Sequence, residues 1–471
     1  MQPPRTRDLD QGDLFRSRLD QMLDPSHSLF KLAQSIDWNV FEREFEPLYD
    51  AGNGRPGLPI RLMVGLHYLK HLYDVSDEVV VATWLENPYW QFFCGGTYFE
   101  HDFPCDPTSL VRWRQRVGAA GMQKLLEQTL STAKRSGLIK AGEVREVNVD
   151  TTVQQKAVAF PTDARLYDKC RRALVRVAKA NGLSLRQSYT FLGKKALHMQ
   201  GRYSAARQGK RARRETKKLR TYLGRVLRDV KRQVAHHDTP DPRLGHIIEI
   251  AERIYTQKRA DGGKIYSVHA PEVVCIAKGK VHQKYEFGCK AHVVTTSRHN
   301  WILSLDAEHG DGGAPYDGST LKNALRQARE LVGLPIEKAC VDRGFRGSSH
   351  HPEDVEILVS GRRGLKVGLK KLLRRRSAIE PVISHAKREH RLDRNYLKGK
   401  EGDRINAILS GCGFNLRKLL RSSHRLKAVV TFLLHWITQE THKIRVNLLL
   451  SRGYAPQRGC KDIRLSLASI A

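Results

Sequence analysis

The sequence lacks the cysteine pattern of a disulfide-rich or zinc-finger protein. Its 471 residues contain eight cysteines, and no two of them are separated by only two residues, as paired zinc-finger ligands are. No secretory signal precedes them, so we expect reduced thiols in the cytoplasm. Disulfide-stabilised folds and zinc fingers are therefore disfavoured.

Long apolar segments are also missing. The longest one near the C-terminus covers residues 426–437 and contains Lys427 and His435. A membrane-spanning helix needs about 20 predominantly apolar residues, so we expect no membrane association. Hydrophobic residues make up 40% of the chain and charged residues 28%, a balance that excludes disordered and collagen-like chains and predicts globular domains.

Acidic residues are scarce compared with basic ones. The chain has 49 Asp and Glu against 82 Lys and Arg, which gives a formal net charge of +33. This excess is far larger than solubility requires, and it predicts a polyanionic partner, with nucleic acid as the first candidate. Residues 1–50, with six basic and ten acidic side chains, do not share it and do not resemble a DNA-binding arm.

The basic charge is concentrated between Arg165 and Ala235, where 22 Lys or Arg accompany three Asp or Glu. An apolar helical stripe runs from Leu219 to Val234, and cations fill the other positions. A solvated face normally mixes both signs, so the near absence of acids favours phosphate binding, without any sign of base readout. Four cations, which we call the four-cation patch, are our candidates for DNA contacts: Arg213, Arg214, Lys217 and Lys218.

The region before residue 140 reads as several short helices joined by Gly, Pro and Asn. Apolar spacing predicts one helix from Leu58, a second after Ser76, whose hydroxyl can cap it, and a third over residues 110–117. Two interpretations stay open for this region. One is helix-turn-helix DNA binding, and the other is packing around its tryptophans, Trp84, Trp90 and Trp113.

An acid stands inside a predicted strand over residues 144–153, where valines alternate with polar residues around Asp150. A carboxylate in this position must pair with a cation, cap a turn through the two following threonines, or bind a metal ion. Strand signals return at 285–296 and 301–305, separated by a hairpin-like loop at 297–300. Residues 318–320 then precede a predicted helix at 321–331, and a strand at 339–341 ends at Asp342. This order predicts an α/β fold with a mixed sheet.

A third acid, Glu380, lies at the start of a predicted helix. Ser377-x-x-Glu380 fits a capping box, which would satisfy backbone donors and nothing more. Alternatively, the helical repeat places Glu380 and Lys387 on one stripe, facing a common site. Three acids that converge in a basic protein can hold two divalent cations for phosphoryl transfer. Asp150, Asp342 and Glu380 therefore indicate a metal-dependent nuclease or strand transferase.

At these residues the sequence resembles bacterial DDE transposases of the insertion sequence 5 (IS5) family, over about residues 28–420. The most specific motif is Arg376-x3-Glu380-x6-Lys387, the Arg, Glu and Lys signature of that family. Leu373 stands where the signature has Tyr, and Ser384 where it usually has Gly. The other matching segments are Arg55–Met63, Trp84–Trp90, Asp106–Leu110, Val149–Thr152, His269–Val273, Lys278–Lys280, Tyr285–Gly288, Pro315–Gly318, Val341–Gly347, Asp393–Gly399 and Gly413–Lys418.

The resemblance implies a ribonuclease H-like core in which Asp150, Asp342 and Glu380 are catalytic and bind metal. The expected cofactor is Mg²⁺, as two ions, with Mn²⁺ able to substitute. The reaction implied is hydrolysis at the element's ends, which frees a 3′-hydroxyl that then attacks target DNA. The expected partners are the terminal inverted repeats, target DNA and further copies of this chain, as a homodimer or higher multimer on DNA. The DNA-contacting residues expected around the cut are Arg343, Arg376 and Lys387.

We expect three regions. Residues 1–140 would form an N-terminal helical domain for DNA binding or assembly, residues 141–425 the catalytic domain with a basic helical insertion at about 161–262, and residues 426–471 a C-terminal helical tail. The protein would be cytoplasmic and associated with the nucleoid. Two rival functions remain: a catalytically silent DNA-binding relic that acts as a repressor or architectural factor, and a ribonuclease or repair nuclease that needs no terminal repeat.

Overall fold

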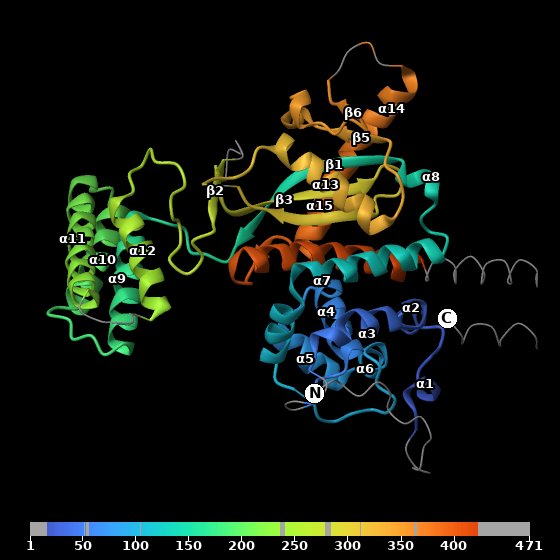
Figure 1. Cartoon of the computed structure of the whole chain (residues 1–471), viewed down its shortest axis with the longest axis horizontal. Coiled ribbons are helices and arrows are strands. Elements are labelled where there is room, and N and C mark those ends of the chain that lie inside the picture. Colours follow the sequence, from blue (N-terminus) through green and yellow to red (C-terminus); the bar gives the residue numbers. More distant parts are fainter. Residues whose placement is uncertain are drawn as a thin grey trace, which may run out of the picture. The chain divides into compact units, whose positions relative to one another are not determined.

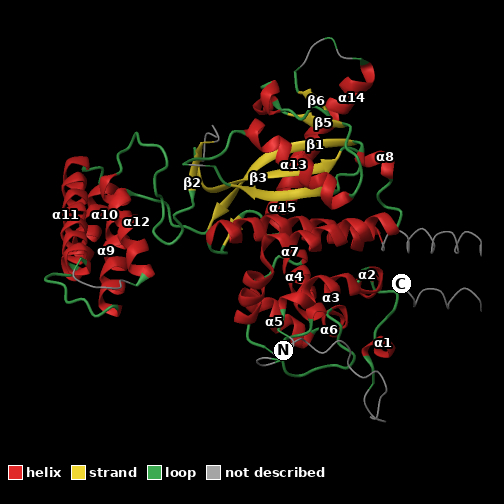
Figure 2. Cartoon of the chain, in the orientation of Figure 1, coloured by secondary structure: helices red, strands yellow, loops and turns green. Residues whose placement is uncertain are grey.

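A computed structural model describes residues 17–422, except 51, 53–55, 104, 236–240, 278–283, 311, 362–363 and 365. The chain divides into two compact units, residues 1–417 and 418–471. The predicted tail at 426–471 lies outside the described residues, as do Arg55 and Lys278–Lys280. Within the described part, no helix is long and apolar enough to cross a membrane. Figure 1 shows the order of the elements, and Figure 2 separates helices from strands.

The N-terminal region is helical. Every residue of α4 except Arg61 is buried, which makes α4 the central helix. The Ser76 hydroxyl accepts a hydrogen bond from the Val79 amide at 3.2 Å and caps α5, as predicted. Trp84, Trp90 and Trp113 are all buried, which confirms the packing interpretation for these side chains. The elements are α1 (Leu19–Met22), α2 (Ser28–Ser35), α3 (Asn39–Phe45), η1 (Glu46–Leu48), α4 (Ile60–Leu72), α5 (Asp77–Glu86), α6 (Pro88–Phe93) and α7 (Thr108–Arg135).

Helix α7 is much longer than the segment 110–117 predicted from the sequence. Gly118, where the apolar pattern stops, has non-helical backbone angles and separates two helical segments within α7, so the predicted end at residue 117 is confirmed. Gly118 has a φ of +66°, a left-handed conformation that glycine adopts without steric penalty. The Glu401 carboxylate accepts a hydrogen bond from the Ala119 amide beside this break, so a backbone donor released by the break is satisfied.

The basic insertion folds as its own helical bundle after α8 (Ala141–Val144) and β1 (Glu146–Lys156). It consists of α9 (Asp163–Ala180), α10 (Thr190–Ala205), α11 (Gly209–Val234) and α12 (Pro242–Thr256). All four helices contribute to one hydrophobic cluster, whose members lie between residues 164 and 268. The predicted stripe is confirmed, because Leu219, Leu223 and Val230 are completely or almost completely buried in this cluster.

The remaining strands form a mixed seven-stranded sheet with β1. Strand β3 pairs antiparallel with β1, β2 and β4, whereas β5 runs parallel to β1 and β6 parallel to β5. The last strand, β7, pairs with the end of β1. A mixed sheet was predicted and is confirmed. The strands are β2 (Val274–Ala277), β3 (Tyr285–Thr296), β4 (Ile302–Glu308), β5 (Lys338–Val341), β6 (Glu356–Val359) and β7 (Arg394–Asn395).

Helices pack against both faces of this sheet (Figure 1). Cys289, Ala291 and Val293 of β3 share a cluster with Ile379 and Val382 of α15 (Ile379–Glu389). The alternate residues of β3 face α13 (Asp317–Val332), because successive side chains of a strand point to opposite faces. The sequence predicted that residues 318–320 precede this helix. They lie inside its first turn instead, because α13 begins at Asp317. The other elements are η2 (Arg343–Phe345), η3 (Ser348–His350), α14 (Val367–Arg375), η4 (Arg376–Ala378) and a helix over residues 399–422.

Candidate active site

The parallel pairing of β1 with β5 brings two of the predicted acids together. Asn148 of β1 lies opposite Cys340 of β5, and two residues further along each segment come Asp150 and Asp342. Asp342 directly follows β5, where its Oδ1 accepts a hydrogen bond from the Gly344 amide at 2.8 Å and caps η2. The strand register therefore places both carboxylates at the same level of the sheet.

Arg376 connects Asp150 to Glu380. Its Nη1 lies 3.4 Å from Asp150 Oδ2, and its Nη2 lies 3.6 Å from Glu380 Oε1. Glu380 is in the first turn of α15, and its side chain is 66% exposed, so the carboxylate remains accessible to a ligand. A single guanidinium thus joins an acid of the sheet to an acid of the neighbouring helix.

The capping box predicted for Glu380 does not form. The Ser377 hydroxyl donates to the Arg374 carbonyl at 3.0 Å, and no side chain caps α15. The reason is that α14 and η4 lead into α15 almost without interruption, so residues 379–381 do not form a free helix start. Of the alternatives predicted for Asp150, the pairing with a cation is confirmed by Arg376; the turn cap is not, because Thr151 and Thr152 continue strand β1, where the Thr151 amide donates to Asp150 Oδ1 at 2.8 Å.

A fourth acid, Asp317, belongs to the same cluster and was missed in the sequence. Its Oδ1 accepts a hydrogen bond from the Thr151 hydroxyl at 2.6 Å and lies 2.8 Å from Lys290 Nζ. A Cβ added to Gly344 would lie 2.9 Å from Asp317 Oδ2 and 3.0 Å from Asp342 Oδ1, so these carboxylates flank Gly344 closely. The sequence signal for Asp317 was the Pro315–Gly318 motif, which matches the family but does not by itself indicate a chemical role.

The crowding of acids affects the ionisation of Asp150. Burial raises the pKa of Asp150 to about 6, and the charges of Asp342 and Asp317 act in the same direction, against the Thr151 amide and Arg376. A carboxylate with a raised pKa among other carboxylates is stabilised by a bound cation. The donors are all oxygen atoms, which hard cations such as Mg²⁺ prefer, so the residues present fit a divalent metal.

The predicted DNA-contacting residues lie in three different places. Arg343 is exposed, and its guanidinium packs against Gly361, where an added Cβ would lie 2.8 Å from Nη2. Lys387 lies on α15 beyond Glu380 and is partly buried. The four-cation patch is exposed on α11. Among the described residues, no hydrogen bond or ion pair joins this patch to the acid cluster.

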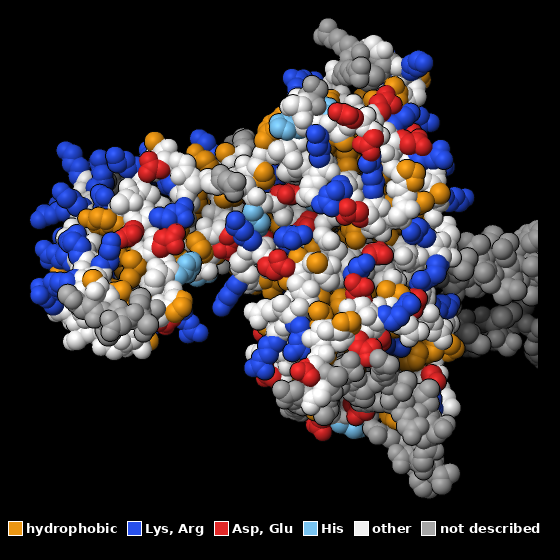
Figure 3. Space-filling view, viewed as in Figure 1, with side chains coloured by type: hydrophobic (Ala, Val, Ile, Leu, Met, Phe, Trp, Pro, Cys, Tyr) orange, Lys and Arg blue, Asp and Glu red, His pale blue; other side chains and the backbone are white. Residues whose placement is uncertain are grey.

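The part of the insertion between Arg165 and Ala235 buries its three acids. Side-chain exposures are 4% for Asp168, 11% for Glu215 and 9% for Asp229, and each of these acids pairs with a Lys or an Arg. These are the three acids between Arg165 and Ala235, so the outer surface of α10 and α11 carries cations without intervening acids. Figure 3 shows Lys and Arg gathered over this bundle.

A second basic surface lies beside the helix that leads to Arg376. A hollow of about 750 Å³ is lined by Arg298 of the β3–β4 turn, by Lys371 and Arg375 of α14, and by Lys140. Arg375 is fixed there, because its guanidinium donates to the carbonyls of Ser297 at 3.2 Å and Arg298 at 2.7 Å. The same hollow is also lined by two acids, Glu143 and Glu146.

Two segments of the chain match families of transposase domains. Residues 17–116 match a family described as "Transposase domain (DUF772)", and residues 350–420, which include Glu380, match a "Transposase DDE domain". A Rhizobium meliloti protein described as "Uncharacterized protein ORF8 in nfe locus" is 50% identical over 197 residues, which cover 42% of this chain and 95% of that protein. No solved structure matches the chain. The two matches support a DDE transposase, a class of nucleic-acid-processing enzymes that act on DNA and normally use a divalent metal.

Proposed function

We propose that the protein is a transposase of the IS5 family that binds the terminal inverted repeats of an insertion sequence, cleaves the element's ends and joins the 3′-hydroxyl ends to target DNA. The observation that carries the proposal is the gathering of three acids from distant parts of the chain. Asp150 and Asp342 share a level of the sheet, and Arg376 links Asp150 to Glu380. If these carboxylates served only to form stabilising ion pairs, three of them would not need to lie around one arginine.

The strand order supports a ribonuclease H-like core. Strands β4, β3, β1, β5 and β6 follow one another across the sheet, with antiparallel pairs on the β3 side and parallel pairs on the β5 side. We propose that this core covers residues 141–425, interrupted by the basic insertion at about 161–262, and that residues 1–140 serve in DNA binding or assembly.

We propose that Asp150, Asp342 and Glu380 hold two Mg²⁺ ions, for which Mn²⁺ can substitute. When bound, the ions activate the attacking oxygen and stabilise the leaving oxygen of the phosphodiester. Asp317 acts as a positioning residue, because its carboxylate holds Thr151 next to Asp150 and is itself fixed by Lys290. Supporting groups of this kind orient ligating carboxylates.

Arg376 has two successive roles in this proposal. In the protein without DNA it compensates the charges of Asp150 and Glu380. Once cations neutralise those acids, its guanidinium can donate to a DNA phosphate, for which its planar fork is well suited. Lys387 and Arg343 would add further phosphate contacts around the cut.

The insertion would bind DNA through its backbone. The three acids between Arg165 and Ala235 are largely buried, and the four-cation patch is exposed, although one of its members, Lys218, pairs with Glu215 at 2.7 Å. Cations of this kind bind phosphates regardless of sequence and release counterions. Cleavage at two element ends requires at least two protomers, so we propose a dimer or higher multimer on DNA, in the nucleoid of a bacterial cytoplasm.

The test is a cleavage assay with Mg²⁺ and labelled DNA that carries the terminal repeats. Asp342→Asn removes a ligating charge with little change in shape and is expected to abolish cutting. Asp354→Asn is the matched control, because Asp354 is 63% exposed and pairs with Arg329 outside the cluster. Cutting by wild type and control alone supports the proposal. Repeat-specific binding without cutting by any of the three proteins points to a DNA-binding relic, and cutting without any need for repeats points to a general nuclease.

A further inference from the structure

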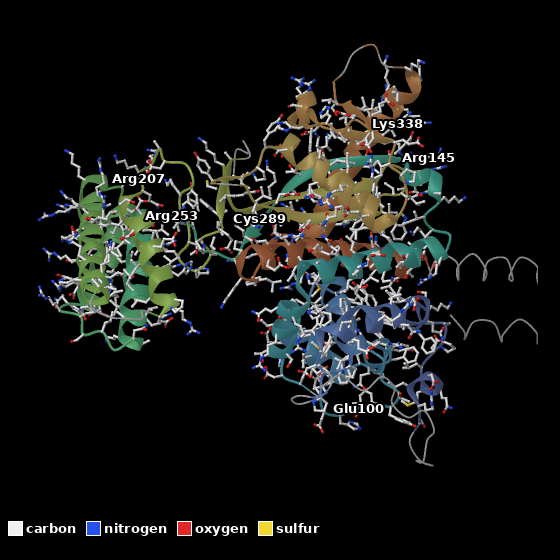
Figure 4. All side chains as sticks on the ribbon, in the orientation of Figure 1. Glu100, Arg145, Arg207, Arg253, Cys289 and Lys338 are labelled. Atoms are coloured by element: carbon white, nitrogen blue, oxygen red, sulfur yellow. The ribbon has the colours of Figure 1, made fainter. Side chains whose placement is uncertain are left out.

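A second group of potential metal ligands lies away from the candidate active site. It contains Cys289 of β3, His309, which directly follows β4, and Asp403 of the helix at 399–422. One donor atom from each residue lies within 4.8 Å of the other two. Figure 4 labels Cys289 at its position on β3. These residues come from three separate elements, and neither the family signature nor the acid cluster includes them.

Neighbouring side chains orient two of the three ligands. Asp403 Oδ1 accepts hydrogen bonds from Lys156 Nζ at 2.7 Å and from Asn395 Nδ2 at 2.6 Å, so Oδ2 is left to face His309. Gln154 Nε2 lies 3.5 Å from Cys289 Sγ, within hydrogen-bond distance. Fixed orientation by surrounding groups is typical of metal ligands.

His309 has a donor atom that lacks a partner. Its Nε2 lies 3.5 Å from Asp403 Oδ2, is inaccessible to solvent, and makes no hydrogen bond to any described residue. Burial lowers the pKa of His309. A buried polar atom without a partner requires an explanation, and a metal ion next to Asp403 would supply one.

The surrounding charges also suit a divalent ion. Lys156, which contacts Asp403, pairs with Glu272 at 3.0 Å, and both side chains are more than 90% buried. Their charges cancel each other. A thiolate and the Asp403 carboxylate would then leave two negative charges for the ion to balance, so a dication makes the buried cluster neutral.

We propose that Cys289, His309 and Asp403 bind a zinc ion. Sulfur and imidazole ligands select zinc over magnesium, which prefers oxygen, so this site differs in kind from the candidate active site. On binding, the Cys289 thiol releases its proton to solvent and the sulfur forms the bond to zinc. Zinc takes four ligands, and water can supply the fourth from a hollow of about 470 Å³ lined by His309, Glu308 and Lys400.

The zinc would connect the sheet to the helix at 399–422. Gln154 and Lys156, which hold two of the ligands, lie on β1, the strand that carries Asp150. The site would therefore stabilise this strand four to six residues beyond Asp150. The inference does not depend on the proposed transposition chemistry, because it rests on different residues.

The first experiment measures zinc in wild-type protein that is expressed in zinc-supplemented medium and purified without a metal-affinity tag. We expect about one zinc ion per chain, bound tightly enough to survive dialysis, as in structural sites. Cys289→Ser and His309→Gln should each lose at least about nine-tenths of this zinc. Cys340→Ser is the matched control, since Cys340 is equally buried on β5, which is separated from β3 by β1, and it should keep its zinc.

A second experiment uses wild-type protein and does not depend on variants that fold. Replacement of zinc by Co²⁺ should give a thiolate-to-cobalt charge-transfer absorption, and removal of the metal should lower the Tm. Wild-type protein that contains no zinc and shows no such absorption with Co²⁺ overturns the inference. Retention of zinc by both Cys289→Ser and His309→Gln also overturns it.

Discussion

The raised pKa of Asp150 leads to a prediction in which an inactivating substitution stabilises the protein. Burial and the neighbouring acids raise this pKa from its ordinary 3.8 to about 6, so the folded chain resists ionisation of Asp150. One pKa unit corresponds to about 1.4 kcal/mol. Ionised Asp150 therefore destabilises the metal-free protein by up to about 3 kcal/mol. Asp150→Asn removes this cost and keeps an oxygen that can accept the Thr151 hydrogen bond.

The pH dependence of this effect has a definite sign. Below pH 3.8 the carboxyl is protonated in both the folded and the unfolded chain, so wild type and Asp150→Asn should differ little. Between pH 3.8 and about 6 only the unfolded chain ionises, and the free energy of unfolding of wild type falls relative to the variant. Above about pH 6 the difference reaches its full value and stays constant.

The assay is urea unfolding followed by circular dichroism, in EDTA, at a series of pH values from 4 to 8. Mg²⁺ should reverse the order of stability, because it stabilises wild type by mass action while the variant lacks a ligating charge. Asp354→Asn serves as control. If Asp150→Asn is no more stable than wild type at pH 8 in EDTA, or if the difference does not change between pH 4 and 7, the electrostatic account of this site is wrong.

Three other predictions concern separate parts of the chain. Asp77→Asn should lower the free energy of unfolding by about 3–5 kcal/mol in urea at pH 7, because it leaves the buried Arg114 and Lys70 without their counter-ion; equal stability would contradict this. Neutralising the four-cation patch should weaken DNA binding and make the slope of log K against log salt shallower by about 3 to 4, whereas an unchanged slope would place the phosphate contacts elsewhere. Asp317→Asn should reduce Mg²⁺-dependent cleavage by about 10- to 100-fold, and wild-type cleavage would remove Asp317 from the site.

Local patterns in the sequence were sufficient to predict several helices and strands. The hydroxyl of Ser76 and the apolar spacing around it predicted the cap of α5, and alternation predicted β3, β4 and the turn between them. These features depend on residues within a few positions of one another. The second segment of α7, after the break at Gly118, was not predicted, because the acceptor for its first amide is a distant residue, Glu401.

The composition of the candidate site could be predicted only in part. The acids Asp150, Asp342 and Glu380 came from strand ends, a helix start and a family resemblance, but Asp317 was signalled only by the Pro315–Gly318 motif, because its role depends on contacts of α13 with Thr151 of β1 and Lys290 of β3. The Cys289, His309 and Asp403 cluster was invisible for the same reason. Its members are 20 and 94 positions apart in the chain, and no fixed spacing joins them.

The position of the basic bundle in the chain has a consequence for evolution. The bundle occupies the connection between β1 and the β2–β3 strands, and its core is built from residues of that connection. The sheet register that aligns the acids is set by strand pairs outside it. The connection can therefore be lengthened, shortened or exchanged between relatives without moving the acids, so the basic surface of the bundle and the acid cluster of the sheet are free to diverge independently.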